Sequence, residues 1–157
     1  MILIAHRGNY LGASKLENHP DHIKDALRLG FDVEVDVWYE NQKLYLGHDK
    51  PIYKIDPDFF DQRFWIHCKN REALDYFIIN SKNVLNYFWH EEDQYTLTSK
   101  NYIWAYPGSL LSENSVMVMP EDQDPTLENT KFVECYGICS DEVQHIKVLR
   151  DRRHNIQ

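Results

Sequence analysis

The most regular pattern of apolar and polar positions lies in residues 31–49. Within it, valines at positions 33, 35 and 37 alternate with Glu34 and Asp36. A period of two is typical of a β-strand, whose successive side chains point to opposite faces. The pattern therefore predicts a strand with three β-branched side chains on one face and two carboxylates together on the other.

Two carboxylates on one face of a strand repel each other, so a cation, several hydrogen-bond donors or water must compensate them. A polar turn at 39–43 and a short alternating run at 44–46 follow the strand, and the segment ends at Gly47-His48-Asp49. One bend of the chain would bring His48 near the two acids. A bound metal ion and a hydrated edge strand are both compatible with this segment taken alone.

Two further apolar runs carry polar residues at their ends or on one face. Residues 1–5 predict a buried parallel strand that ends in His6-Arg7-Gly8. The run FWIHCKN, which starts at Phe64, predicts a strand with His67 and Lys69 on one face. Because α/β folds gather their chemistry at the carboxyl ends of parallel strands, these residues are candidates for a functional site.

Helical spacing and capping residues predict a helix that begins at Pro20, is capped by Asn18 or His19, and is ended by Gly30. The remaining predicted elements are a short helix or turn at 55–62, a helix at 71–80, strands near 84–89, 95–98, 102–106, 115–119 and 132–138, and a closing helix at 141–152.

Strands that alternate with helices predict parallel β/α units in an α/β fold. An ordinary eight-unit barrel needs about 250 residues, or about 200 at the low end, whereas this chain has 157. We therefore expect a single domain over residues 1–157, a compact TIM-type (β/α) barrel with reduced or missing helices; an open sheet is the conventional alternative. An incomplete layer of helices around the barrel would leave apolar surface that a second copy of the chain could cover, so the sequence also predicts a homodimer.

The composition narrows the class of protein. With 17 Lys and Arg against 25 Asp and Glu, the formal charge of -8 argues against binding to nucleic acid. No run of 18 apolar residues is present, so no membrane span is predicted. The three cysteines, at 68, 135 and 139, lack the number and spacing of a disulfide framework, and the chain opens without the features of a signal peptide, so we expect a cytoplasmic protein.

An ordered set of short motifs lies at these predicted strand ends. His6-Arg7-Gly8, Glu17-Asn18, Glu34-x-Asp36 and His48-Asp49 follow one another, and a strand bearing Lys69 comes next. In this order and at these separations the set resembles the glycerophosphodiester phosphodiesterase family, within the phosphatidylinositol-phospholipase-C-like phosphodiesterase group. The resemblance extends roughly as far as Asn70, and residues 136–141 are a fainter echo of the family's last strand with its Thr-Asp ending.

The resemblance implies that Glu34 and Asp36 hold a hard divalent cation, Mg²⁺ or Ca²⁺. Where the family's third strand has a Glu-x-Lys pair whose Glu binds the metal, this chain has His67. His67 is then a third, softer metal ligand, or a hydrogen-bond donor to phosphate if it does not reach the ion. An imidazole ligand shifts the metal preference of the site toward Mn²⁺ or Zn²⁺. The small inserted region that follows the family's His-Asp motif is also absent from this sequence.

For the remaining residues the resemblance implies acid–base and binding roles. His6 and His48 form the acid–base pair, because histidine alone has an ordinary pKa that allows one copy to be charged and another neutral near pH 7; which of them is the base is left open. Arg7 and Lys69 bind phosphate oxygens, and Glu17 orients Arg7 or a ligand. In the family the base typically activates a neighbouring hydroxyl of the substrate, which gives a cyclic phosphate.

These assignments predict a metal-dependent phosphodiesterase that cleaves a small-molecule, glycerophosphodiester-like substrate by His/His acid–base catalysis. A catalytically inactive phosphodiester-binding module and a phospholyase that releases only cyclic phosphate are the alternatives. His90 and the acidic residues after it extend the site or form a solvated turn, and the turn is favoured. Trp65, Trp89, Trp104 and Tyr106 either stack on a sugar or alkyl group or pack in the interior.

Overall fold

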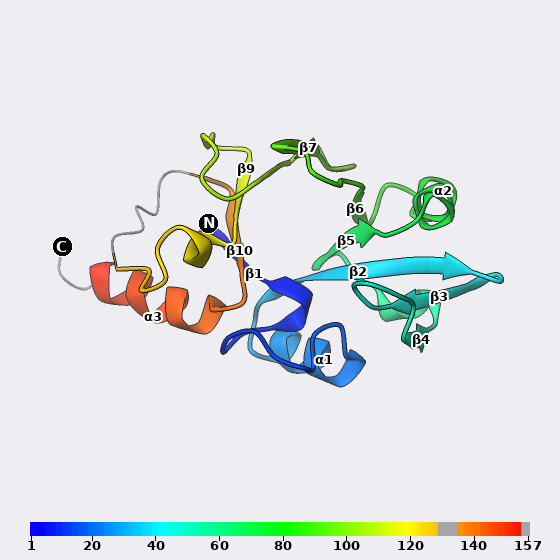
Figure 1. Ribbon diagram of the computed structural model, residues 1–157, viewed down its shortest axis with the longest axis horizontal. Helices are drawn as coiled ribbons and strands as arrows, with labels where there is room; N and C mark the ends of the chain where they lie inside the picture. Colours follow the sequence, from blue (N-terminus) through cyan, green and yellow to red (C-terminus); the bar gives the residue numbers. More distant parts are fainter. Residues whose placement is uncertain (129–134, 155–157) are drawn as a thin grey trace.

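One curved sheet is built around β2 (Asp32–Glu40), the longest strand of this computed structural model (Figure 1). One edge of β2 pairs in parallel with β1 (Ile2–Ala5) and further along, antiparallel, with β3 (Lys43–Leu46). The other edge pairs in parallel with β5 (Phe64–Cys68). Residues 33–37 all pair with β5 on one edge, and on the other edge β1 reaches Val33 and β3 reaches Val37. All five residues are buried.

The structure describes residues 1–128 and 135–154. Within them the other strands are β4 (Tyr53–Ile55), β6 (Asn86–Phe88), β7 (Tyr95–Leu97), β8 (Ile103–Ala105), β9 (Ser115–Val118) and β10 (Gly137–Ser140). Beyond β1 the parallel ladder continues through β10, β9 and β8, and beyond β5 it continues to β6. The remaining pairs, β3 with β4 and β7 with β8, are antiparallel.

The prediction of a compact TIM-type (β/α) barrel is wrong, because the sheet is a curled, mixed half-barrel (Figure 1). Among the described residues an α-helix connects paired parallel strands only from β1 to β2 and from β5 to β6, so the regular β/α alternation of a barrel is missing. The helical elements of the described residues are α1 (Pro20–Arg28), α2 (Arg71–Asn80), α3 (Val143–His154) and the 3₁₀ turns η1 (His6–Gly8), η2 (Pro57–Phe59) and η3 (Pro120–Asp122). The three α-helices lie around the outside of the curve (Figure 1). Within the described residues, none of the helices has the length and apolar character needed to cross a membrane.

The lengths of the connections explain the missing helices. Six residues (89–94) separate β6 from β7, five (98–102) separate β7 from β8, and nine (106–114) separate β8 from β9. A crossover that contains a helix needs at least about 10–12 residues, so these connections are loops. After β2 the chain forms the β3–β4 hairpin before it reaches β5, which adds antiparallel pairs to a sheet predicted to be parallel.

The predictions for the first two helices are confirmed. Helix α1 begins at Pro20, and the Nδ1 atom of His19 accepts a hydrogen bond from the backbone N–H of Asp21 at 3.2 Å. Helix α2 occupies residues 71–80 as predicted, and Asn70 caps its first turn. Local signals were sufficient to predict these helices: capping residues for α1, and the helical spacing of apolar residues for α2.

Other predicted bounds shift. The helix or turn expected at 55–62 is the 3₁₀ turn η2, preceded by strand β4. The last strand begins at Gly137, because its ladder with β1 starts with the pairing of Ile2 and Gly137. Residues 132–134 of the predicted strand lie outside the described residues.

Apolar side chains are buried on both faces of the sheet. The valines at 33, 35 and 37 belong to the larger, outer core between the sheet and the helices, whereas Glu34 and Asp36 face inward. The predicted alternation of β2 is therefore confirmed. A smaller cluster fills the inner face, and its members are Ile4, Trp65, Phe88, Trp104, Val116 and Cys139.

The inner cluster also shows how strongly the sheet curls. The rings of Phe88 on β6 and Trp104 on β8 lie 4.7 Å apart between centroids. These strands are at opposite ends of the parallel path, and no strand ladder joins them in the described part of the chain. Side-chain contacts, together with a hydrogen bond from the backbone N–H of Ser99 to the carbonyl oxygen of Tyr87 on β6 at 2.9 Å, therefore bring the two ends of the sheet together without a strand ladder.

We predict that Ile66→Ala lowers the free energy of unfolding by about 2–5 kcal/mol, because it leaves a cavity in the outer core. Ile66 is fully buried on β5. The matched control is Ile79→Ala on α2, where the side chain is 75% exposed and a change within about 0.5 kcal/mol is expected. Urea unfolding of both variants tests this, and equal losses at the two positions would contradict the burial described here.

Candidate functional site

A cavity of about 690 Å³ opens where the parallel strands reach their carboxyl ends. All eight residues predicted from the sequence line it: His6, Arg7, Glu17, Glu34, Asp36, His48, His67 and Lys69. The curled sheet gathers them because β1, β2 and β5 are neighbours and run in the same direction. This is the edge at which α/β folds commonly bind their ligands.

The two carboxylates of β2 are fixed by hydrogen bonds from the loop after β1. Asn18 donates from Nδ2 to Asp36 Oδ2 at 2.9 Å and accepts from the backbone N–H of Asp36, also at 2.9 Å. The backbone N–H of Arg7 donates to Glu34 Oε2 at 3.0 Å. Both carboxylates are almost inaccessible to water, with 2% of Glu34 and 1% of Asp36 exposed. Their positions are thus set before any ligand arrives.

Positive groups surround Asp36. Arg7 Nε lies 3.2 Å from Asp36 Oδ2, and Lys69 Nζ lies 3.6 Å from Asp36 Oδ1. Burial opposes the charge on Asp36, but the contact with His67 and the charges of Arg7 and Lys69 outweigh it and hold the pKa of this carboxyl well below its usual range. Asp36 is therefore ionised at neutral pH.

The negative charge of Glu34 is compensated much less than that of Asp36. Burial, and then the charge of Asp36, raise the pKa of Glu34 above its usual value. Its nearest ionisable neighbours of opposite sign are His6 and His67, each with a ring nitrogen 3.9 Å from a Glu34 oxygen. Glu34 Oε1 accepts no hydrogen bond from the described residues. This oxygen has the capacity to bind a cation.

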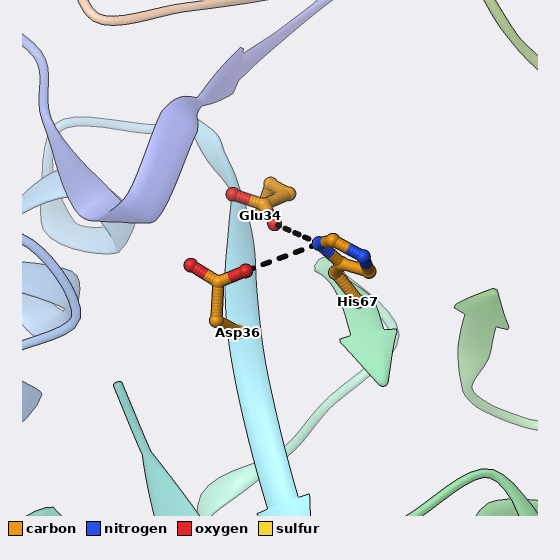
Figure 2. Close-up of side chains that lie close together, drawn as sticks. All are labelled: Glu34, Asp36 and His67. Carbon is orange, nitrogen blue, oxygen red and sulfur yellow. Dashed lines mark ion pairs between the residues drawn. The ribbon is translucent and has the colours of Figure 1, made fainter. Parts of the chain in front are cut away.

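Glu34, Asp36 and His67 converge on one point (Figure 2). Their candidate ligand atoms all lie within 4.8 Å of one another. The register of the sheet pairs Asp36 with His67, so the imidazole extends from β5 beside the carboxylates of β2. The His67 Nδ1 atom lies 3.0 Å from Asp36 Oδ1 and 3.9 Å from Glu34 Oε1.

The hydrogen bonding of His67 indicates what the three residues fit. Its Nε2 atom lies 3.2 Å from the backbone carbonyl oxygen of His90. A carbonyl only accepts, so Nε2 carries hydrogen, and in a neutral ring Nδ1 then presents a lone pair to the carboxylates. That arrangement is favourable only with a second proton on the ring or a cation between the groups. An imidazole whose other N–H binds a carbonyl is also typical of metal ligands, so the donor set fits a divalent cation.

The charge balance of the cavity points the same way. The lining residues include two cations, Arg7 and Lys69, against seven carboxylates, Glu17, Glu34, Asp36, Glu91, Asp93, Asp122 and Asp141. A cavity with this excess of negative charge would repel a phosphate anion unless further positive charge were bound. A metal ion at the three converging residues supplies such charge.

His6 is oriented by a residue from the far end of the chain. Its Nδ1 atom lies 2.9 Å from Asp141 Oδ1, which also accepts a hydrogen bond from Asn9 Nδ2 at 2.9 Å. Burial opposes protonation of His6, but the hydrogen bond with Asp141 and the charge of Glu34 outweigh it and raise the pKa of His6. Asp141 engages Nδ1 and leaves Nε2 on the side of Glu34, 3.9 Å from Oε2.

Asp141 was not among the residues predicted for the site. The sequence contains a clue, because Ser140-Asp141 follows the last apolar run, which resembles the family's final strand. The structure adds Glu121, which accepts hydrogen bonds from the backbone N–H of Asp141 at 2.9 Å and from Ser140 Oγ at 2.8 Å. Sequence spacing alone does not connect Glu121 with this group.

The remaining predicted residues divide into two groups. Glu17 joins the contacting set through Arg7, whose NH1 donates to Glu17 Oε2 at 3.0 Å. His48 lines the cavity, but its Nδ1 atom lies 2.8 Å from Asp49 Oδ1, and it contacts no other predicted site residue of the described chain. His6 and His48 therefore share a cavity without forming a contacting pair.

His90 lies closer to the site than the sequence indicated. Its ring stacks on His67, with centroids 4.5 Å apart, and it lines the cavity. Burial and the charges of His67 and Lys69 lower the pKa of His90 to about 4, so its ring is neutral at pH 7. The acidic residues that follow, 91–93, are exposed, as expected of a solvated turn.

In comparisons with known proteins, no family model, no curated protein and no solved structure matched this chain. Functional assignments therefore depend on the geometry of the cavity and on the motif resemblance that its residues carry.

We predict that the protein binds Mn²⁺ and that Glu34→Gln raises the dissociation constant by at least about tenfold, since loss even of an outer partner typically costs 10–100-fold. Isothermal titration of metal-stripped protein measures this. Glu113→Gln, at an exposed position outside the cavity, is the matched control. Equal affinities in the two variants would show that Glu34 is not a ligand.

Proposed function

We propose that the protein is a metal-dependent phosphodiesterase of the glycerophosphodiester phosphodiesterase type, acting on a small-molecule phosphodiester. One observation carries the proposal. A single cavity combines a buried carboxylate pair, an imidazole that converges on it, and a second imidazole oriented by an aspartate. Phosphodiester cleavage needs these functions: charge neutralisation, and groups that accept and donate protons.

In this proposal Glu34, Asp36 and His67 hold the divalent cation. Two carboxylates suit Mg²⁺ or Ca²⁺, and the imidazole ligand also admits Mn²⁺ or Zn²⁺. When bound, such a cation neutralises charge on the non-bridging oxygens of a phosphodiester.

The protein's own side chains supply the rest. His6 exchanges a proton through Nε2, since Asp141 engages Nδ1. Lys69 and Arg7 bind phosphate oxygens; the NH1 of Arg7 is engaged by Glu17, which sets the plane of the guanidinium. His48, which lines the same cavity, serves as the second acid–base group. Each histidine can act as the acid or as the base.

A phosphodiester-binding module without catalysis is the second candidate. Two observations favour it: His48 faces Asp49 rather than the other site residues, and His67 replaces the carboxylate that the resemblance places on the third strand. Binding alone would require neither the orientation of His6 by Asp141 nor an acid–base pair. Catalysis and binding must therefore be measured separately.

We predict that metal-stripped protein regains hydrolysis of bis(p-nitrophenyl) phosphate or glycerophosphodiesters when Mg²⁺, Ca²⁺, Mn²⁺ or Zn²⁺ is added. His6→Ala should lower kcat by about 10²–10⁴-fold, the usual contribution of a general acid or base, while phosphodiester binding persists. His145→Ala, at an exposed position on α3, is the matched control and should leave kcat unchanged.

The outcomes separate the candidates. Phosphodiester binding with no turnover under any metal would favour the binding module. Phosphorus NMR of the products would reveal a cyclic phosphate that persists if the protein is a phospholyase. Neither binding nor turnover would refute the proposal.

We further infer a cytoplasmic location. The support is the set of free thiols: Cys68, Cys135 and Cys139 are unpaired, and two of them are buried. Free buried thiols are typical of proteins in reducing compartments.

We also propose that the chain forms a homodimer through the outer face of β7 and β8. This face carries Leu97 and Leu110, which are 67% and 87% exposed, beside Tyr95 and Ile103. None of the residues that line this groove is charged, so two copies of a chain with a formal charge of -8 could meet there without direct like-charge contact. Light scattering at micromolar concentration should give a dimer, and Leu97→Asp a monomer; a monomeric unmodified protein would refute the dimer.

A further inference from the structure

The cavity has two chemically different walls. The residues of the candidate metal and acid–base site come from the middle of the parallel path, on or after β1, β2, β5 and β10. The apolar lining residues, called here the apolar wall, come from strands and loops toward the two ends of that path: Trp89, Trp104, Tyr106, Pro107, Val118 and Met119. The curl brings β6 against β8, as the 4.7 Å contact of Phe88 with Trp104 shows, so apolar residues from both ends of the path line the same cavity.

Met119 has an unusual backbone conformation for its residue type. It lies directly after β9 with φ 45° and ψ 58°, in the left-handed region. Glycine or asparagine adopts this conformation more easily than a long unbranched side chain. A strained residue whose side chain lines a cavity is a reason to look for a role of that side chain in the cavity.

Tyr106 is available to a ligand. It follows β8, lines the cavity, and is 60% exposed, so its ring is not needed to fill the interior. No hydrogen bond of its hydroxyl group is formed with the described residues. Trp104, two residues earlier, is buried in the inner cluster and also lines the cavity.

We propose that this wall binds an apolar substituent of the substrate, so that the preferred phosphodiester carries a bulky apolar alcohol on one side of phosphorus. The proposal rests on the proposed function for the phosphate end of the ligand. A phosphate with a glycerol group would leave the wall unused, whereas a cavity of about 690 Å³ is of the size that encloses larger ligands.

The acidic residues of the cavity limit the far end of such a substrate. Glu91, Asp93 and Asp122 belong to the same lining and are near this wall in sequence, next to Trp89 and Met119. They would repel a second phosphate or a carboxylate. The apolar substituent therefore carries no negative charge.

The test is titration of dimethyl, dihexyl and diphenyl phosphate into the Mg²⁺-loaded protein. All three carry one negative charge and differ only in their alcohol groups. The dihexyl or the diphenyl ester should bind at least about tenfold more tightly than the dimethyl ester, as expected from burying two or more additional methylene equivalents. The two larger esters distinguish an alkyl from an aryl substituent.

Two variants link any preference to the wall. Met119→Asn and Tyr106→Ser should each remove most of the preference without changing the affinity for dimethyl phosphate. Met119→Asn should also keep or raise the unfolding temperature, because asparagine tolerates the left-handed conformation; a merely structural methionine would not change the preference. Leu29→Ser is the control, since Leu29 is an apolar residue that is 46% exposed and lies outside both this cavity and the proposed dimer groove.

The failures are distinguishable. If all three esters bind equally, or if the wall variants keep the preference, the apolar wall is refuted and the phosphodiesterase proposal stands. If none of the esters binds, both are overturned.

Discussion

Glu34 and Asp36 stand side by side on the inner face of β2 with almost no access to water, and two like charges in such a place are unfavourable unless neighbouring groups compensate each of them. Much of the surrounding structure does this. The loop after β1 turns so that the backbone of Arg7 reaches one carboxylate and its guanidinium reaches the other. Asn18 and Lys69 complete the shell of Asp36. The negative charge of Asp36 is compensated more fully than that of Glu34. Glu34 is therefore left able to bind a cation, and this difference is the basis of the candidate metal site.

Three residues with left-handed backbones mark the two walls of the cavity. Arg7 (φ 52°) and Asn18 (φ 60°) serve the ionic wall, and Met119 (φ 45°) lines the apolar wall. At such positions glycine would be the unstrained choice. In the ionic wall the reason for a side chain is visible, because the side chains of Arg7 and Asn18 both contact Asp36. By analogy, the apolar side chain of Met119 is best explained by a group that occupies the cavity.

The sequence was sufficient where the determining interactions are local. Alternation in β2 assigned its valines to one face and its acids to the other, capping residues predicted α1, and the helical spacing of apolar residues predicted α2. The sequence was insufficient where contacts between distant segments determine the structure. Short connections were visible in the sequence, yet whether they close a barrel or leave a curled half-barrel depends on how the sheet ends meet, and the predicted barrel was wrong. The same holds for the site: His48 is near in sequence to the acids, but among the described residues its side chain forms a hydrogen bond with Asp49 and none with the acids, whereas Asp141 orients His6 from 135 positions away.

The pairing of β1 with β10 makes the site depend on a contact between segments that lie far apart in the chain. β1 can pair with β2 once the loop that carries α1 is closed, but its second edge stays open, and His6 lacks Asp141, until β10 joins the sheet. Contacts of such long range are slow to form, and an exposed strand edge invites association with other chains in the interval. The site is therefore completed only after the most distant pairing of the sheet has formed, and the folding protein passes through a period in which β1 must be kept from wrong partners.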